Sequence, residues 1–272
     1  MLKTRVKTVV VLNILIIPLV IFSYIPYLMN TAVALLSIAA VYEIYSVTDR
    51  LEKDEISFAV SCMAAVALCF VPIPEKAKIL AAFLALAVLF FVIVMIKTCR
   101  FNFGSPVAVF ALCLMIPLFL SSISDIRSLG LGVYCVFMMI INSIVTEMGG
   151  YFVGRKLGKH KFAPTVSPNK SVEGSLGGIF ACLIIINALA AAVSAIVGFS
   201  VDWLKLEIYI VLCSVIGQLG DLTMSSVKRS VGVKDFGTCL PGHGGVLDRF
   251  DGQLFAAPFT YAFISLVGKI IY

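Results

Sequence analysis

Charged residues are scarce in this chain. Of its 272 residues only 13% are Asp, Glu, Lys or Arg, whereas 61% are hydrophobic. Ordinary soluble domains contain roughly 25% charged and 45–50% apolar residues. A soluble fold could not cover so much apolar surface, but lipid can solvate it. The composition therefore excludes an ordinary soluble domain and predicts an integral membrane protein.

Cysteine and histidine patterns that hold metals or disulfides are also lacking. None of the eight cysteines forms a Cys-x-x-Cys pair, and the chain has only two histidines. Most of the cysteines lie inside apolar segments, so we interpret them as small buried hydrophobic residues. The formal charge is +6, but no basic run interleaved with aromatic residues suggests a nucleic-acid groove. We therefore expect no nucleic acid among the partners.

Long apolar runs divide the chain into about nine candidate spans, each of which needs about 20 residues to cross a bilayer. Spans in lipid must be helical because every backbone polar group needs an internal partner. The sequence thus predicts an all-α, polytopic bundle of transmembrane helices with active-site loops on the cytoplasmic side. The candidate spans are 8–28, 30–47, 57–74, 78–96, 104–121, 130–150, 174–198, 204–225 and 253–271.

The first apolar run follows three basic residues, as in a secretory signal. It is too long for such a signal, and no small-residue cleavage site follows it, so we expect a retained first helix. We assign N-terminal transmembrane helices to 1–100 and a C-terminal transmembrane catalytic region to 101–272, within one structural unit.

Lysine and arginine residues indicate the orientation. If the N-terminus is cytoplasmic, the cytoplasmic segments hold a large majority of these residues, as the positive-inside rule requires. The few on the opposite side are Lys76, Lys78, Arg127, Lys205 and Lys269. This orientation also places two polar stretches, at about 151–173 and 226–252, on the cytoplasmic side, which is the first indication of a shared site.

An aspartate within a candidate span begins the more C-terminal polar stretch. Asp221, Ser225 and Lys228 are spaced so that they share one helix face. An ionisable residue inside a span is costly and therefore points to function. The alternative is that Asp221 merely forms an ion pair with Lys228 or Arg229 at the membrane edge.

The loop that follows mixes three kinds of residue. Carboxylates suit a hard cation such as Mg²⁺, basic side chains suit phosphate oxygens, and glycines let backbone N–H groups approach phosphates. This mixture predicts a polyphosphate site with its metal, and the alternative is a solvated loop with turn glycines. The residues are Lys234, Asp235, Gly237, Gly242, His243, Gly244, Gly245, Asp248, Arg249, Asp251 and Gly252.

The other polar stretch, from Glu147 to Gly178, is also basic and rich in glycine. Ser171, with Glu173 or Gly174, is placed to begin the next helix. The basic run at 155–161 could instead bind anionic lipid headgroups in general. His160 within it is interpreted as an interfacial residue.

Residues 225–251 resemble the signature of the phosphatidate cytidylyltransferases, also called CDP-diacylglycerol synthases. The pattern is Ser-x-apolar-Lys-Arg, four residues, Lys-Asp-x-small, two residues, apolar-Pro-x-His-Gly-Gly-apolar-x-Asp-Arg-apolar-Asp, and every specified position is met. Asp221 after a glycine, the 149–155 segment and the 167–174 segment also fit, so the resemblance covers about 140–252. The chain departs at Glu147, where the family usually has Asp, and at Gly150, where it has a small residue such as Ala.

The resemblance implies that CTP and phosphatidate give CDP-diacylglycerol and pyrophosphate. It implies Mg²⁺, paired with K⁺, with Asp221 and Asp248 as the metal ligands. It implies catalytic roles for Asp221, Lys228, Arg229, Lys234, Asp235, His243, Asp248, Arg249 and Asp251. It implies substrate-binding roles for Glu147, Tyr151, Arg155, Ser167, Lys170, Ser171, Glu173, Ser225, Gly244 and Gly245.

The length resembles that of the compact bacterial members, which indicates a multi-pass protein of a bacterial plasma membrane, surrounded by lipids. The oligomeric state is left open, with a homodimer as one option. Three alternatives remain: a related enzyme that uses another lipid phosphate, such as an isoprenoid-ether lipid phosphate; a transporter lined by Asp221 and Glu43; and an inactive scaffold, which Glu147 would favour.

Overall fold

The computed structural model describes residues 16–71, 74, 75, 77, 79, 104–164, 166–240 and 244–271, and it is mostly helical there. A two-stranded hairpin accompanies the helices. In chain order the elements are η1 (Phe22–Tyr24), α2 (Leu28–Val47), α3 (Glu55–Phe70), α5 (Pro106–Ser128), α6 (Gly132–Leu157), β1 (Lys161–Ala163), β2 (Ser167–Ser171), α7 (Val172–Val197), α8 (Trp203–Ser230) and α9 (Leu247–Val267).

Five of these helices, α2, α5, α6, α7 and α8, are long and apolar enough to cross a membrane. Helix α3 is a shorter apolar helix of 16 residues. The all-α membrane class is therefore supported. Nearly all of the predicted span at 78–96 and the first part of the one at 8–28, residues 8–15, lie outside the described residues, so the count of about nine spans stays a prediction.

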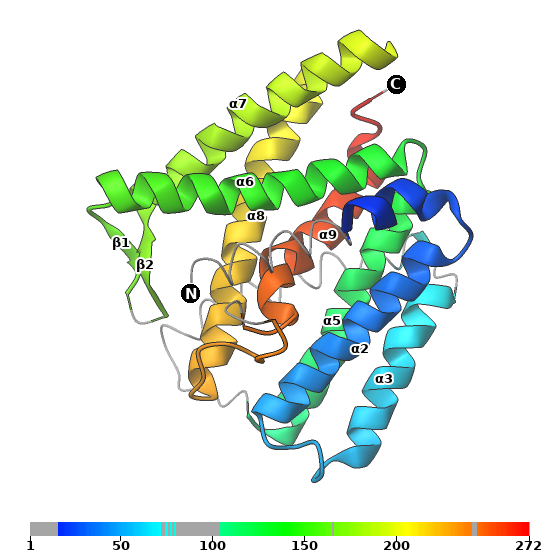
Figure 1. The fold of residues 1–272 in the computed structure, drawn as a ribbon, viewed down its shortest axis with the longest axis vertical. Helices are drawn as coiled ribbons and strands as arrows, with labels where there is room; N and C mark the ends of the chain where they lie inside the picture. Colours follow the sequence, from blue (N-terminus) through cyan, green and yellow to red (C-terminus); the bar gives the residue numbers. More distant parts are fainter. Residues whose placement is uncertain are drawn as a thin grey trace.

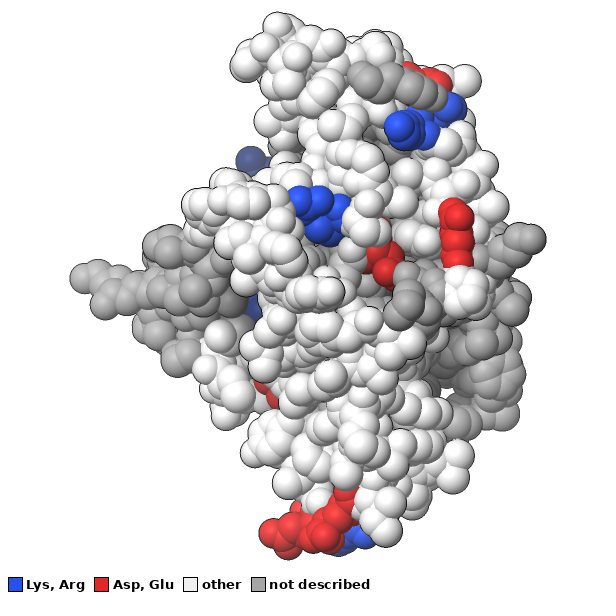
Figure 2. Space-filling view, turned by 90° about the vertical axis from the view of Figure 1, so that its right-hand side faces the viewer, with Lys and Arg blue, Asp and Glu red and all other residues white. Residues whose placement is uncertain are grey.

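The described helices form two groups that meet along α9. Helices α2, α3 and α5 pack together, and α5 also packs against α9 (Figure 1). Helix α6 packs along α7, and α8 packs along α9. The rings of Phe119 on α5 and Phe255 on α9 meet edge to face at 5.4 Å in the core between the groups. Figure 2 shows a face that is mostly uncharged, with charged side chains gathered in a few small groups.

The two polar stretches contain more regular structure than the predicted loops. Helix α6 continues to Leu157, and the hairpin of β1 and β2 occupies much of the interval before α7. Helix α8 continues to Ser230, and α9 already begins at Leu247. Asp248 therefore lies on the first turn of a helix, where the partial positive charge of the helix N-terminus stabilises a carboxylate, and Asp251 lies on the next turn.

Ser171 joins the hairpin to α7. Its hydroxyl accepts a hydrogen bond of 3.1 Å from the backbone N–H of Gly174, so Ser171 is the N-cap of α7. This hydrogen bond satisfies one of the N–H groups that have no acceptor within the helix. The prediction that Ser171 begins the next helix is confirmed, and the cap fixes where β2 ends beside α6.

Helices α6 and α7 approach each other closely because small residues face each other across their contact. A Cβ atom at Gly178 would overlap the backbone carbonyl oxygen of Thr146, and one at Gly149 would lie 2.8 Å from the Cβ of Ala181. Small residues at such positions allow membrane helices to come together at backbone distance. This approach brings the polar residues of α6 next to the start of α7.

The close approach predicts that bulk at Gly178 destabilises the protein. Gly178→Val should reduce the free energy of unfolding by about 1–3 kcal/mol, because the added methyl groups push α7 away from α6. Ala188→Val, which adds two methyl groups at an exposed position of α7, is the control. Melting temperatures of the two variants in detergent measure the difference, and equal temperatures would contradict the packing described here.

Candidate active site

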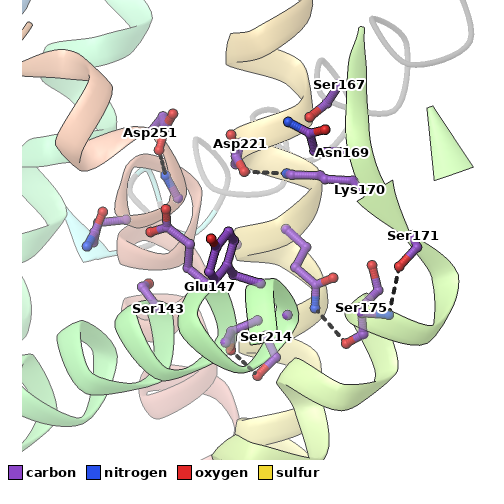
Figure 3. Close-up of a pocket in the computed structure, with 18 residues that line it drawn as sticks. Ser143, Glu147, Ser167, Asn169, Lys170, Ser171, Ser175, Ser214, Asp221 and Asp251 are labelled. Atoms are coloured by element: carbon purple, nitrogen blue, oxygen red, sulfur yellow. Dashed lines mark hydrogen bonds and ion pairs between the residues drawn. The ribbon is translucent and has the colours of Figure 1, made fainter. Parts of the chain in front are cut away.

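A cavity of about 270 Å³ lies where the two polar stretches meet. Four helices and strand β2 contribute to its wall (Figure 3). The lining residues are Ser143, Thr146, Glu147, Gly150, Tyr151, Ser167, Asn169, Lys170, Ser171, Gly174, Ser175, Ser214, Gly217, Gln218, Asp221, Asp251, Gly252 and Gln253. The predicted convergence of the two stretches is therefore found in the structure.

Helical faces of small and polar residues build much of this wall. On α6 the lining residues recur at the three- and four-residue intervals that place side chains on one face, ending at Tyr151. On α8 the same spacing runs from Ser214 through Gln218 to Asp221. Sequence reasoning missed Ser143, Thr146, Ser214 and most of these positions. The regular recurrence of small and polar residues within apolar spans could have identified them.

An ion pair between Lys170 and Asp221 crosses the cavity (Figure 3). Lys170 lies on β2 and Asp221 on α8, so this ion pair joins the two polar stretches directly. Ser225, one turn further along α8, lies with its hydroxyl 3.4 Å from Asp221 Oδ1. The partner of Asp221 is therefore Lys170, and the alternative of a local ion pair with Lys228 or Arg229 is wrong.

Lys228 is buried between two carboxylates of α9. Its Nζ lies 2.8 Å from Asp248 Oδ1 and 3.6 Å from Asp251 Oδ2, and its side chain is 9% exposed. The same ammonium group lies 5.3 Å from the centre of the Phe236 ring. A buried lysine needs such partners because an unpaired charge away from water is very unfavourable. Lys228 thus fixes α8 to the beginning of α9.

Both carboxylate oxygens of Asp248 accept hydrogen bonds from groups of the protein. Oδ1 accepts from Lys228, and Oδ2 accepts hydrogen bonds of 2.8 Å from the backbone N–H groups of Phe236 and Gly245. Gly244 has a positive φ of 86°, and a Cβ there would lie 2.8 Å from Asp248 Oδ2. Asp248 therefore holds the loop before α9 in place, and it is not among the residues that line the cavity.

Three carboxylates share the cavity wall: Glu147, Asp221 and Asp251. They come from α6, α8 and α9, and electrostatic repulsion acts among them. Within the described part of the chain no group of three or more His, Cys, Asp or Glu side chains is arranged to hold a metal ion on its own. Mg²⁺ commonly binds through one or two carboxylates plus substrate phosphates, and these residues fit that kind of site.

Several of the other predicted site residues support the loops around the cavity. Glu173 accepts hydrogen bonds from the backbone N–H groups of Lys159 and His160, and it lies 2.5 Å from His160 Nδ1. Arg229 donates to the carbonyl oxygen of Val233 at 2.8 Å. These contacts hold the ends of the hairpin and of α8.

The remaining predicted residues lie at the edge of the site or beyond it. Arg155 donates a hydrogen bond of 3.3 Å to the hydroxyl of Tyr151, which lines the cavity. Lys234 and Asp235 are exposed, and Arg249 is half-buried on α9. His243 lies outside the described residues, so the role predicted for it stays a prediction.

A buried polar network lies beside the cavity. Thr146 and Ser214 are joined by a hydrogen bond of 3.0 Å, and Ser214 donates to Asn142 Oδ1 at 3.1 Å. Asn142 in turn donates to the carbonyl oxygen of Ile210 at 3.3 Å. This network ties α6 to α8 beside the charged groups, so the two helices hold a defined spacing.

The fold and the site define a helical membrane protein with carboxylates and lysines gathered in one cavity. Residues 3–267 match the model of the cytidylyltransferase family, and the chain belongs to this family.

Named relatives support this assignment. The chain is 33% identical over 248 residues to the phosphatidate cytidylyltransferase of Staphylococcus aureus (strain COL), a match that covers 86% of this chain and 91% of that protein. It is 43% identical over 143 residues to the enzyme of the same name from Bacillus subtilis (strain 168), over 52% of each chain. A Staphylococcus saprophyticus protein of that name is 47% identical over 135 residues, or 49% of each chain.

These matches confirm the family resemblance inferred from 225–251. They also extend it, because the family match begins at residue 3. The first hundred residues therefore share more with the family than hydrophobic character alone, although no short motif there revealed it.

The contribution of the Lys228 ion pairs to the stability of the protein can be measured. Lys228→Met should leave Asp248 and Asp251 without their cation and should destabilise the protein by about 3–5 kcal/mol. Lys53→Met is the matched control, since Lys53 forms an exposed ion pair with Asp49 and its loss should destabilise the protein much less. Thermal unfolding in detergent compares the variants, and an equal loss in both would contradict the structural role of the buried pair.

Proposed function

We propose that this protein transfers CMP from CTP to phosphatidate, giving CDP-diacylglycerol and pyrophosphate. The observation that supports this most directly is the cavity, in which Lys170 pairs with Asp221 and Asp251 lines the same wall. These residues belong to the segments that resemble the phosphatidate cytidylyltransferases, and the relatives carry that name. The charged cavity and the family match thus point to the same reaction.

The transfer reaction requires cationic groups that neutralise the negative charges of CTP and phosphatidate more than it requires a strong base. The attacking phosphatidate oxygen is already an anion, and pyrophosphate leaves in line from the α-phosphorus of CTP. The main obstacle is the repulsion between two polyanions, so positioning and cationic groups supply most of the catalysis. Lys170 in the cavity wall is placed for this role, and Lys228 holds the neighbouring helices in register.

A divalent cation completes the proposal. Bound Mg²⁺ would neutralise charge on the transferring phosphate groups, and K⁺ beside it belongs to the same prediction. Asp221 lines the cavity and is suited to hold the metal together with substrate phosphates. Asp251 lines the same cavity and is better placed than Asp248, whose oxygens already accept hydrogen bonds from Lys228, Phe236 and Gly245. We therefore add Asp251 to the predicted metal ligands.

We further propose that the cavity faces the cytoplasm, where CTP is available, in a bacterial membrane. Bacterial relatives and five long apolar helices support the membrane location, and the excess of lysine and arginine on the predicted cytoplasmic segments supports the orientation. A lipid phosphate lies at headgroup depth, so a site near the ends of the spans would receive phosphatidate from the bilayer and CTP from water.

The reaction is tested with purified protein, radiolabelled CTP, phosphatidate and Mg²⁺, followed by lipid extraction. Label in the organic phase and release of pyrophosphate are expected, and Asp221→Asn should abolish both while the protein stays folded in detergent. A transporter would release no pyrophosphate. A parallel arm with an isoprenoid-ether lipid phosphate separates the acceptors: faster labelling of the ether lipid would replace phosphatidate in the proposal, and no labelling of either would overturn it.

The metal assignment is tested by titrating Mg²⁺ against activity in three matched variants. Asp251→Asn should raise the Mg²⁺ concentration for half-maximal activity severalfold, because it removes a carboxylate from the cavity. Asp248→Asn should mainly lower the melting temperature, since that carboxylate binds Lys228 and two backbone N–H groups. Arg155→Gln controls for a charge change at the rim. An unchanged Mg²⁺ requirement in Asp251→Asn together with a raised one in Asp248→Asn would favour Asp248 as the ligand.

A further inference from the structure

Glu43 is a buried acidic residue that lies on α2, outside the segments that form the cavity. It is 3% exposed, and it is the one acidic residue of α2. A buried carboxylate is unfavourable unless strong hydrogen bonds replace its water, so its partners indicate its purpose. Those partners lie some two hundred residues further along the chain, at the start of α9.

Both carboxylate oxygens of Glu43 accept hydrogen bonds from the first residues of α9. Oε1 accepts from the backbone N–H of Val246 at 2.6 Å, and Oε2 accepts from that of Leu247 at 2.9 Å. The first N–H groups of a helix have no acceptor within the helix, and a negative charge there is stabilised by the helix dipole. Val246 is the N-cap residue and supplies no side-chain cap of its own. Glu43 therefore supplies the cap from another helix.

Two glycines fit around this carboxylate. A Cβ atom at Gly245 would lie 2.5 Å from Glu43 Oε2, and one at Gly237 would lie 2.8 Å from Oε1. The loop between α8 and α9 thus closes directly onto Glu43, and two of its glycines are required by this approach. The contact fixes both the direction of α9 and the path of the loop that precedes it.

The same first turns of α9 carry the acidic residues of the site. Asp248 follows Leu247 directly, accepts from Gly245 and Phe236, and pairs with Lys228. Asp251, one turn later, lines the cavity. A displacement at Val246 and Leu247 would therefore move both carboxylates relative to Asp221 on α8.

We propose that Glu43 is a positioning residue for the transfer reaction: by capping α9 from α2 it sets the place of Asp251 opposite Asp221. This inference rests on the proposed function for its kinetic consequence. It assigns to the N-terminal helices a part in the reaction, and it removes Glu43 from the list of residues that would line a transport path.

The test compares Glu43→Gln with Tyr209→Phe. The amide keeps the size of the side chain but presents an N–H group to one backbone N–H and loses the charge. Tyr209→Phe removes a buried 3.0 Å hydrogen bond to Thr260 in the other half of α9, far along the helix from its cap. Both variants should lower the melting temperature, whereas only one of them disturbs the cap.

We expect Glu43→Gln to reduce kcat by roughly tenfold to a hundredfold, as a small misplacement of reacting groups does. The KM values for CTP and phosphatidate should stay within about twofold, because the binding groups of β2 and α6 are untouched. Glu43→Asp, which keeps the charge on a shorter side chain, should recover part of the lost kcat. Tyr209→Phe should keep the kcat of the unchanged protein.

Hydrogen exchange provides a readout that does not depend on turnover. In Glu43→Gln the amides at 246–251 should exchange faster, while those in the second half of α9 keep their protection. Unchanged exchange at 246–251 would overturn the capping role, and faster exchange with an unchanged kcat would overturn the positioning role. An equal loss of kcat in Tyr209→Phe would show that general destabilisation explains the effect. Failure of the proposed function shows separately, as absence of CTP-dependent labelling by the unchanged protein.

Discussion

The site depends on ion pairs, because an unpaired charge away from water is very unfavourable. Asp221 is partly exposed and pairs with Lys170 across the cavity, whereas Lys228 could not remain buried without Asp248 and Asp251. Each of these ion pairs joins elements that are separate in the chain. Because each of these charges needs an oppositely charged partner, the ion pairs help to determine how β2, α8 and α9 are arranged. The cavity lies where these elements meet.

Sequence reasoning predicted the membrane class and the convergence of the two polar stretches, because composition and the rarity of charge in lipid are strong constraints. The N-cap at Ser171 was predictable too, since capping is local chemistry. The partner of Asp221 was not, because Lys170 approaches it through a hairpin whose register no periodicity reveals. Asp248 and Asp251 were assigned to a loop, since glycines before them obscured the start of α9.

Glu43 shows why contacts between residues far apart in the chain are the hardest to predict from the sequence. A single acidic residue in an apolar run has no spacing relation to Val246, and only the packing of α2 and α5 beside α9 brings them together. The same holds for Ser214 and Thr146, which are small polar residues on two helices whose crossing places them within 3.0 Å. Local patterns identify which residues are unusual, but the tertiary arrangement decides what they touch.

The capping contact between α2 and α9 also has a consequence for biosynthesis. The two residues that it joins are separated by 203 positions, so most of the described helices lie between them in the chain. Chains form from the N-terminus, and contacts between distant positions are completed late. A nascent polypeptide would therefore insert most of its helices without an assembled cavity, and the ability to consume nucleotide would arise only after the start of α9 has been synthesised.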